Sequence, residues 1–182
     1  NKGWKASDKD HFVSLKSKGF GYLYNSSYDS AVIYGQRMLK EGYTYDSPYA
    51  VIYGHIILGQ AYTMKGNASL AFDNFKKARE NCLQYDSLKA LCSVYNGLGL
   101  YAMNISNDYY RALSYFFSGL QTAHTVRNEE LSSILLVNIS AVYCLKRDTA
   151  GMEYLLEAYE AGKRGHNYYI LYISAINVAY MY

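Results

Sequence analysis

The sequence predicts an all-α protein built as a solenoid, a stack of similar helix pairs. A small residue recurs at intervals of 40, 41 and 39 residues, at Ala31, Ala71, Ala112 and Gly151. Only one of the 182 residues is proline, and 51% are hydrophobic while 18% are charged. No alternating run bounded by hairpin turn residues predicts a strand. The period therefore predicts repeats, which stack into an extended binding surface rather than an enclosed reaction pocket.

The first three helices are expected around short polar turns. The first covers about residues 8–24 and the second about 28–41, with Gly42 as the exit of the second helix. Ser47 and Pro48 then open the third helix. A serine hydroxyl accepts from an unpaired backbone N–H there, and proline at the first helical position loses no hydrogen bond. This helix is expected to reach about Lys65 and to break at Gly66.

Each of the next three helices follows a residue that can cap its first turn. The fourth is expected after Asn67 and runs to about Leu83, the fifth after Asp86 or Ser87 to about Met103, and the sixth after Asn107 and Asp108 to about Thr125.

The last three helices complete the pattern. Asn128 opens the seventh, and Glu129 and Glu130 follow it at the positive end of the helix dipole. The seventh helix is expected to run to about Lys146, the eighth from Asp148 to before Gly165, and the ninth from after Asn167 to the end of the sequence. The prediction is one repeat domain, residues 1–182, of four helix pairs and an unpaired C-terminal helix, with repeats at about 8–42, 47–83, 86–126, 128–164 and a partial 167–182.

Composition and charge argue against several function classes. The net charge is +3, and the densest basic group is only Lys76, Lys77 and Arg79, so no nucleic-acid footprint is visible. No apolar stretch approaches the roughly 20 residues that span a bilayer. We therefore expect a soluble domain, with no nucleic-acid partner and no membrane span, in a cytoplasmic or periplasmic compartment that the sequence does not distinguish. The chain begins at Asn1 and ends at Tyr182 within an apolar pattern, so we expect an excerpt of a longer protein.

Catalysis finds no support in the sequence. The histidines lie in different pairs, with no His-Glu-x-x-His pattern, at His11, His55, His124 and His166. The cysteines lack a metal or redox spacing and are expected to pack as small apolar residues, at Cys82, Cys92 and Cys144. His55 is likewise expected to be a packed side chain. The prediction is a protein that is not an enzyme and has no cofactor and no metal site.

One segment carries a family signature. Hallmark spacing joins Leu58, Gly59, Tyr62, Gly66, Ala71, Phe75 and Ala78. This spacing resembles that of the tetratricopeptide repeat family. The other copies match in part: Gly35 replaces the expected bulky residue of the first pair, the third has one inserted residue, and the fourth has one deleted. The period is near 40 rather than the family's 34, which implies longer helices or longer links between pairs.

The resemblance implies a right-handed α–α superhelix whose concave face is lined by the first helix of each pair. Longer-period arrays of this kind are similar to those in bacterial signalling regulators. The positions it assigns to that face are Lys16, Phe20, Tyr53, Ile56, Gln60, Asn96, Leu100, Val137 and Ala141. The family's carboxylate clamp needs several basic and amide residues, and only Lys16 and Asn96 qualify, so that partner is not expected.

The expected function is a non-catalytic scaffold that binds a protein or peptide, as the sensing or docking part of a larger regulator. Tyrosine, at 23 residues, suits such a surface because its ring is rigid and its tip polar. One alternative is a sensor of a sugar or short peptide, in which polar groups converge beside stacked rings. Another is homodimerisation through the C-terminal helix, if Ile173, Ile176 and Tyr180 are exposed.

Overall fold

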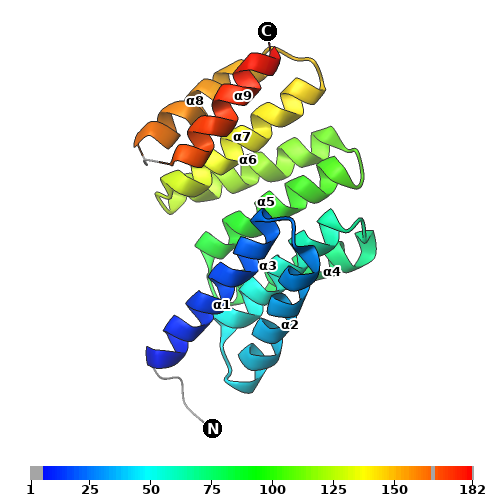
Figure 1. Cartoon of the computed structure of the whole chain (residues 1–182), viewed down its shortest axis with the longest axis vertical. Coiled ribbons are helices and arrows are strands. Elements are labelled where there is room, and N and C mark those ends of the chain that lie inside the picture. Colours follow the sequence, from blue (N-terminus) through cyan, green and yellow to red (C-terminus); the bar gives the residue numbers. More distant parts are fainter. Residues whose placement is uncertain (1–5, 165–166, 182) are drawn as a thin grey trace. The chain divides into compact units, whose positions relative to one another are not determined.

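The computed structural model describes residues 6–164 and 167–181, and these residues form nine α-helices and no strand. Neighbouring helices pack pairwise, which confirms the predicted all-α helical-repeat solenoid (Figure 1). Asn1, Gly165, His166 and Tyr182, which the sequence analysis named, lie outside the described residues. The helices are α1 (Ala6–Tyr24), α2 (Tyr28–Thr44), α3 (Pro48–Met64), α4 (Ala68–Gln84), α5 (Leu88–Asn104), α6 (Tyr109–Thr125), α7 (Glu129–Leu145), α8 (Gly151–Arg164) and α9 (Tyr168–Met181).

The chain divides into two compact units, Asn1–Gly97 and Leu98–Tyr182, and the boundary falls within α5. In the first unit α3 packs against α1, α2 and α4. In the second unit α7 packs against α6, α8 and α9. The first helices of successive pairs thus adjoin within each unit, α1 with α3 and α7 with α9.

The long period comes from long helices. Helices α2 to α7 each have 17 residues. Two such helices already account for 34 residues, the whole length of the usual repeat. The turns 25–27, 45–47, 65–67 and 85–87 are equally short, whether they lie within a pair or between pairs. The inserted residue of the third pair lies in the longer turn 105–108.

Nearly all turns share one geometry, because the end of one helix is also the start of the next. In the turn at Asp46 this residue has a positive φ of 53°, and the Ser47 N–H donates to the Gly42 carbonyl at 2.8 Å. This is the Schellman arrangement of a helix C-terminus. Ser47 then accepts from the Ala50 N–H at 3.3 Å and so caps α3 as predicted. Other caps follow the same rule, at Asn67, Asp108, Asn128 and Asn167.

The positive-φ positions predict a stabilising substitution. Arg127 has φ 51°, and an L side chain in this conformation costs about 1–2 kcal/mol that glycine avoids. Arg127→Gly is expected to raise the free energy of unfolding by about 1 kcal/mol in urea titrations. Asn107, with φ 50°, is the matched control, because asparagine tolerates this conformation and Asn107→Gly should change little. Equal effects at both positions would contradict the explanation.

The expected exit of the second helix at Gly42 is wrong. The helix continues to Thr44, and Gly42 is buried within it. A Cβ atom at Gly42 would lie 3.0 Å from both the Ala50 Cβ and the Val51 backbone nitrogen. The glycine therefore serves the close packing of α2 on α3, not the end of a helix. The eighth helix also starts later than expected, at Gly151, because the Asp148 carboxylate accepts from the Ala150 N–H in a turn before it.

Candidate functional site

A lysine and three aromatic rings meet where α1 packs on α3. Lys16 and Phe20 are four residues apart on α1, and Tyr49 and Tyr53 are four apart on α3. Residues at this spacing share a helix face. Because α1 and α3 pack together, the two stripes meet. We call these four residues the Lys16 cluster.

The geometry of the Lys16 cluster is that of a cation held over rings. The Lys16 ammonium lies 4.7 Å from the Tyr53 ring centroid and 5.9 Å from that of Tyr49. The Tyr49 and Tyr53 centroids are 4.7 Å apart, and Phe20 meets Tyr53 edge-on at 6.4 Å. Such contacts are worth roughly 0.5–2 kcal/mol each and fix the side chains in place. The cluster is therefore organised before any ligand arrives.

The two tyrosines differ in exposure. Tyr53 is only 7% exposed, while Lys16, Phe20 and Tyr49 are half-buried. Burial raises the pKa of both the Tyr49 and the Tyr53 hydroxyl, so both are neutral at physiological pH. Tyr53 is therefore the buried member of the cluster, and the other three side chains are partly open to solvent.

The predicted face residues divide between the two units. The first unit holds Lys16, Phe20, Tyr53, Ile56, Gln60 and Asn96, and the second holds Leu100, Val137 and Ala141. Gln60 and Asn96 are partly exposed. Ile56 and Val137 are both buried, so the structure gives each of them a packing role. The structure brings together Lys16, Phe20 and Tyr53 of the predicted set; the binding role of the whole set stays a prediction.

Sequence reasoning missed Tyr49. Tyr49 lies in the first turn of α3, outside the positions that the repeat alignment assigns to the concave face. Its position one helical turn before Tyr53 is the signal that would have found it.

His55 is packed, as expected, and it links three helices. It is 4% exposed, and its Nδ1 donates to the Asn74 Oδ1 on α4 at 2.9 Å. The Asn74 amide in turn donates to the Leu70 carbonyl, which fixes the direction of this bond. The His55 Nε2 is then free to accept from the Tyr43 hydroxyl of α2 at 3.4 Å.

This burial predicts a pH dependence of stability. Desolvation, together with the nearby Lys77 charge, lowers the pKa of His55 from 6.5, although the Asn74 bond opposes the shift. Below pH 6.5 the unfolded chain binds the proton more readily than the folded chain does, so the free energy of unfolding should fall. His55→Phe is expected to flatten the pH dependence of urea midpoints in this range. The pKa of Glu41 is lowered below 4.5, because hydrogen bonds from Arg37 and His11 outweigh the effect of its burial. Titration of Glu41 therefore changes the stability at lower pH than titration of His55 does. An unchanged slope in the variant would contradict the assignment.

The cysteines behave as apolar packing residues in the first unit. Cys82 and Cys92 are buried free thiols, and burial raises their pKa values to about 12 and about 11. Because the thiolate is the reactive form, these groups are unreactive at neutral pH. Cys144 is only partly buried.

The small-ligand alternative needs rings and polar groups in one hollow. A solvent-open depression of about 370 Å³ lies where the α1–α2 turn meets the end of α3, lined by Ser26, Ser27, Tyr28, Asp29, Ser30 and Lys65. An ion pair between Lys65 and Asp29 crosses it. Among these lining residues Tyr28 alone is aromatic, so the depression does not itself combine stacked rings with converging polar groups.

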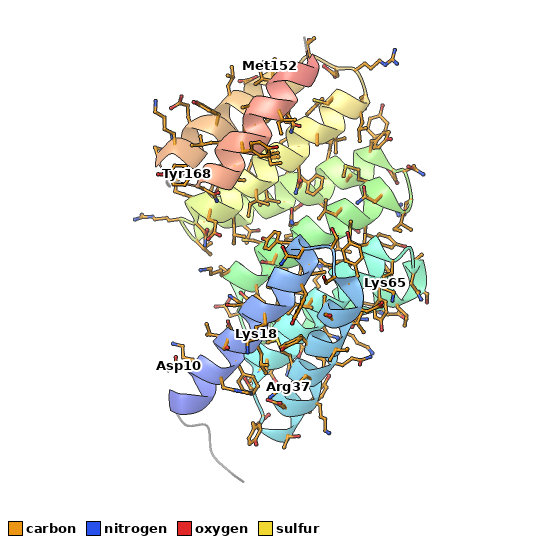
Figure 2. The ribbon with its side chains drawn as sticks, in the orientation of Figure 1. Asp10, Lys18, Arg37, Lys65, Met152 and Tyr168 are labelled. Atoms are coloured by element: carbon orange, nitrogen blue, oxygen red, sulfur yellow. The ribbon has the colours of Figure 1, made fainter. Side chains whose placement is uncertain are left out.

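Self-association through α9 also stays a prediction. Tyr168, at the start of α9 (Figure 2), is 77% exposed and Tyr172 is 64% exposed. Ile173 and Ile176 are only partly exposed, and the Tyr180 side chain lies outside the described residues.

Comparison with known proteins assigns no family. Models of known protein families do not match the chain, and a search of curated proteins finds no match either. The structure establishes helical repeats without identifying the tetratricopeptide type. No helix in the described residues has both the length and the apolar character for crossing a membrane. In the same part of the chain, no group of three or more His, Cys, Asp or Glu residues could hold a metal ion.

Proposed function

We propose that the chain is a non-catalytic scaffold of tetratricopeptide type that binds a protein or peptide segment, as the docking or sensing part of a larger regulatory protein. The observation that carries the proposal is the Lys16 cluster, where rings and a cation from two adjoining first helices are fixed in place yet partly exposed. In the resemblance drawn from the sequence, the same helices line the binding face.

The chemistry of the Lys16 cluster suits a peptide. Ring edges bury the apolar part of a ligand, and little rotamer entropy is lost because the rings are already packed. The Lys16 ammonium and Tyr49 hydroxyl can donate hydrogen bonds to backbone carbonyls. The Gln60 amide, three turns along α3 from Tyr49, adds a donor and an acceptor. This combination favours an extended peptide over a reacting substrate.

The test is quantitative capture from a native lysate with a Lys16→Met/Gln60→Ala variant. Both side chains are partly exposed, so circular dichroism should show an unchanged fold. Capture of the partner is expected to weaken about tenfold or more, which corresponds to roughly 1.4 kcal/mol. Lys18→Met is the matched control: Lys18 is exposed on the same helix (Figure 2), about 200° around it from Lys16. Equal capture of the partner by the parent chain, the Lys16→Met/Gln60→Ala variant and the Lys18→Met variant would contradict the proposal.

A further inference from the structure

A second group of rings around a lysine lies in the second unit. Lys146 follows α7, and its ammonium is 4.5 Å from the Tyr110 ring centroid and 5.9 Å from that of Tyr143. Tyr143 stacks on Tyr154 of α8 at 5.5 Å and 7°, and Tyr154 meets Phe117 of α6 edge-on at 5.6 Å. We call these five residues the Lys146 cluster. It joins α6, α7 and α8.

The Lys146 cluster exposes more than packing requires. Tyr110 is 78% exposed although its ring lies against Lys146, and Leu145, next to Lys146 in the chain, is 56% exposed. Phe117 is 36% exposed. A ring that only held helices together would be buried, because burial supplies most of the stabilisation. The open Tyr110 face beside a fixed cation is therefore available to a partner.

The charges around the Lys146 cluster are uneven. None of the ion pairs among the described residues involves Lys146. The nearest acidic residue in the chain, Asp148, instead accepts from the Ala150 N–H at 3.0 Å. Arg147, beside Lys146, is exposed. At the other end, Glu153 and Glu157 lie close enough to Tyr154 to influence it electrostatically. Lys146 thus lies at the Tyr110 end of the cluster, where Asp108 pairs with Arg111, and Glu153 and Glu157 lie at the Tyr154 end.

We propose that the Lys146 cluster is a second docking site, distinct from the Lys16 cluster, for a peptide segment in which a carboxylate side chain neighbours an aromatic or aliphatic one. The carboxylate pairs with the Lys146 ammonium, and the apolar neighbour covers Tyr110 and Leu145. A charge-assisted contact beside a ring that excludes water is stronger than one in open solvent. Glu153 and Glu157 set the direction of the segment by repelling its carboxylate from the Tyr154 end.

The experiment selects peptides from a random display library on the intact chain. The best binder is then synthesised with blocked ends, in its acidic form and with Asp or Glu replaced by Asn or Gln. Enriched peptides are expected to carry an acidic residue beside an apolar one. In fluorescence anisotropy, affinity should fall about tenfold on amide replacement and on Lys146→Met. Tyr110→Ala, at a position too exposed to disturb folding, should weaken binding as well.

Lys16→Met separates the two sites. Binding that survives Lys16→Met but not Lys146→Met supports the second site, whatever the fate of the proposed function. The proposal is overturned if no peptide is enriched, if the enriched peptides lack acidic residues, or if amide replacement leaves affinity unchanged. The proposal is also overturned if Lys16→Met weakens the binding of the enriched peptides while Lys146→Met leaves it unchanged.

Discussion

Gly99→Ala is expected to lower the free energy of unfolding by about 3 kcal/mol, because it overpacks a crossing with no free space. A Cβ atom at Gly99 would lie 2.3 Å from Phe116 Cε1, well inside van der Waals contact. Phe116 is fully buried, so its ring cannot move into solvent. The loss exceeds the roughly 1 kcal/mol that alanine gains over glycine in a helix.

The chain itself shows how this clash is relieved. In the fourth pair the corresponding positions hold Ser140, which is larger than glycine, and Leu155, which is smaller than phenylalanine, and both are fully buried. The double variant Gly99→Ala/Phe116→Leu should therefore recover more than half of the loss. Alanine is preferred to serine because the Ser140 hydroxyl has no hydrogen-bond partner.

Urea unfolding of the two single variants and the double variant measures the coupling between the positions. Phe116→Leu alone leaves space and should be destabilising, whereas it should be favourable in the Gly99→Ala background. Additive losses would show that the ring does not fill the space over Gly99.

Gly35→Ala is expected to cost about 2 kcal/mol. A Cβ atom here would lie 2.8 Å from Leu58 Cγ and 3.2 Å from the Gly54 carbonyl oxygen. The approach is reciprocal, since a Cβ atom at Gly54 would lie 3.1 Å from the Gly35 carbonyl oxygen. A backbone oxygen cannot change rotamer, so α2 and α3 must separate to admit the methyl group.

The matched control for Gly35→Ala is Gly21→Ala in α1. A Cβ atom at Gly21 meets no heavy atom within 4 Å, so the substitution should stabilise the helix by up to about 1 kcal/mol. Thermal unfolding of the two variants compares the positions directly. A Gly35→Ala variant as stable as the parent chain would contradict the close crossing of α2 and α3.

Local features of the fold could be predicted from sequence, because their causes are local. Ser47, Asn67 and Asn128 cap helices as expected, since a cap needs only its own turn. The end of the second helix was wrongly predicted at Gly42. A glycine is needed there because Ala50 and Val51 of the neighbouring helix leave no room for a side chain. The replacement of a bulky residue by Gly35 was visible in the sequence, but its cause, the contact with Gly54, was not.

The candidate site was predictable only where helix contacts follow the repeat. Lys16, Phe20 and Tyr53 come together because α1 and α3 adjoin, as the first helices of neighbouring repeats do. Ile56 is buried instead, because α3 packs against three helices and keeps few exposed positions. The Lys146 cluster had no sequence signal: its rings come from α6, α7 and α8, and only the tertiary packing brings them together.

Site-specific photo-crosslinking tests peptide docking on the first unit most directly. A photo-reactive phenylalanine analogue is placed at position 20, in the Lys16 cluster, or at position 18, on the far side of α1. The captured partner should crosslink from position 20 and not from position 18, and Lys16→Met should reduce the yield. Equal yields from both positions, or crosslinking only from position 18, would contradict docking at the Lys16 cluster.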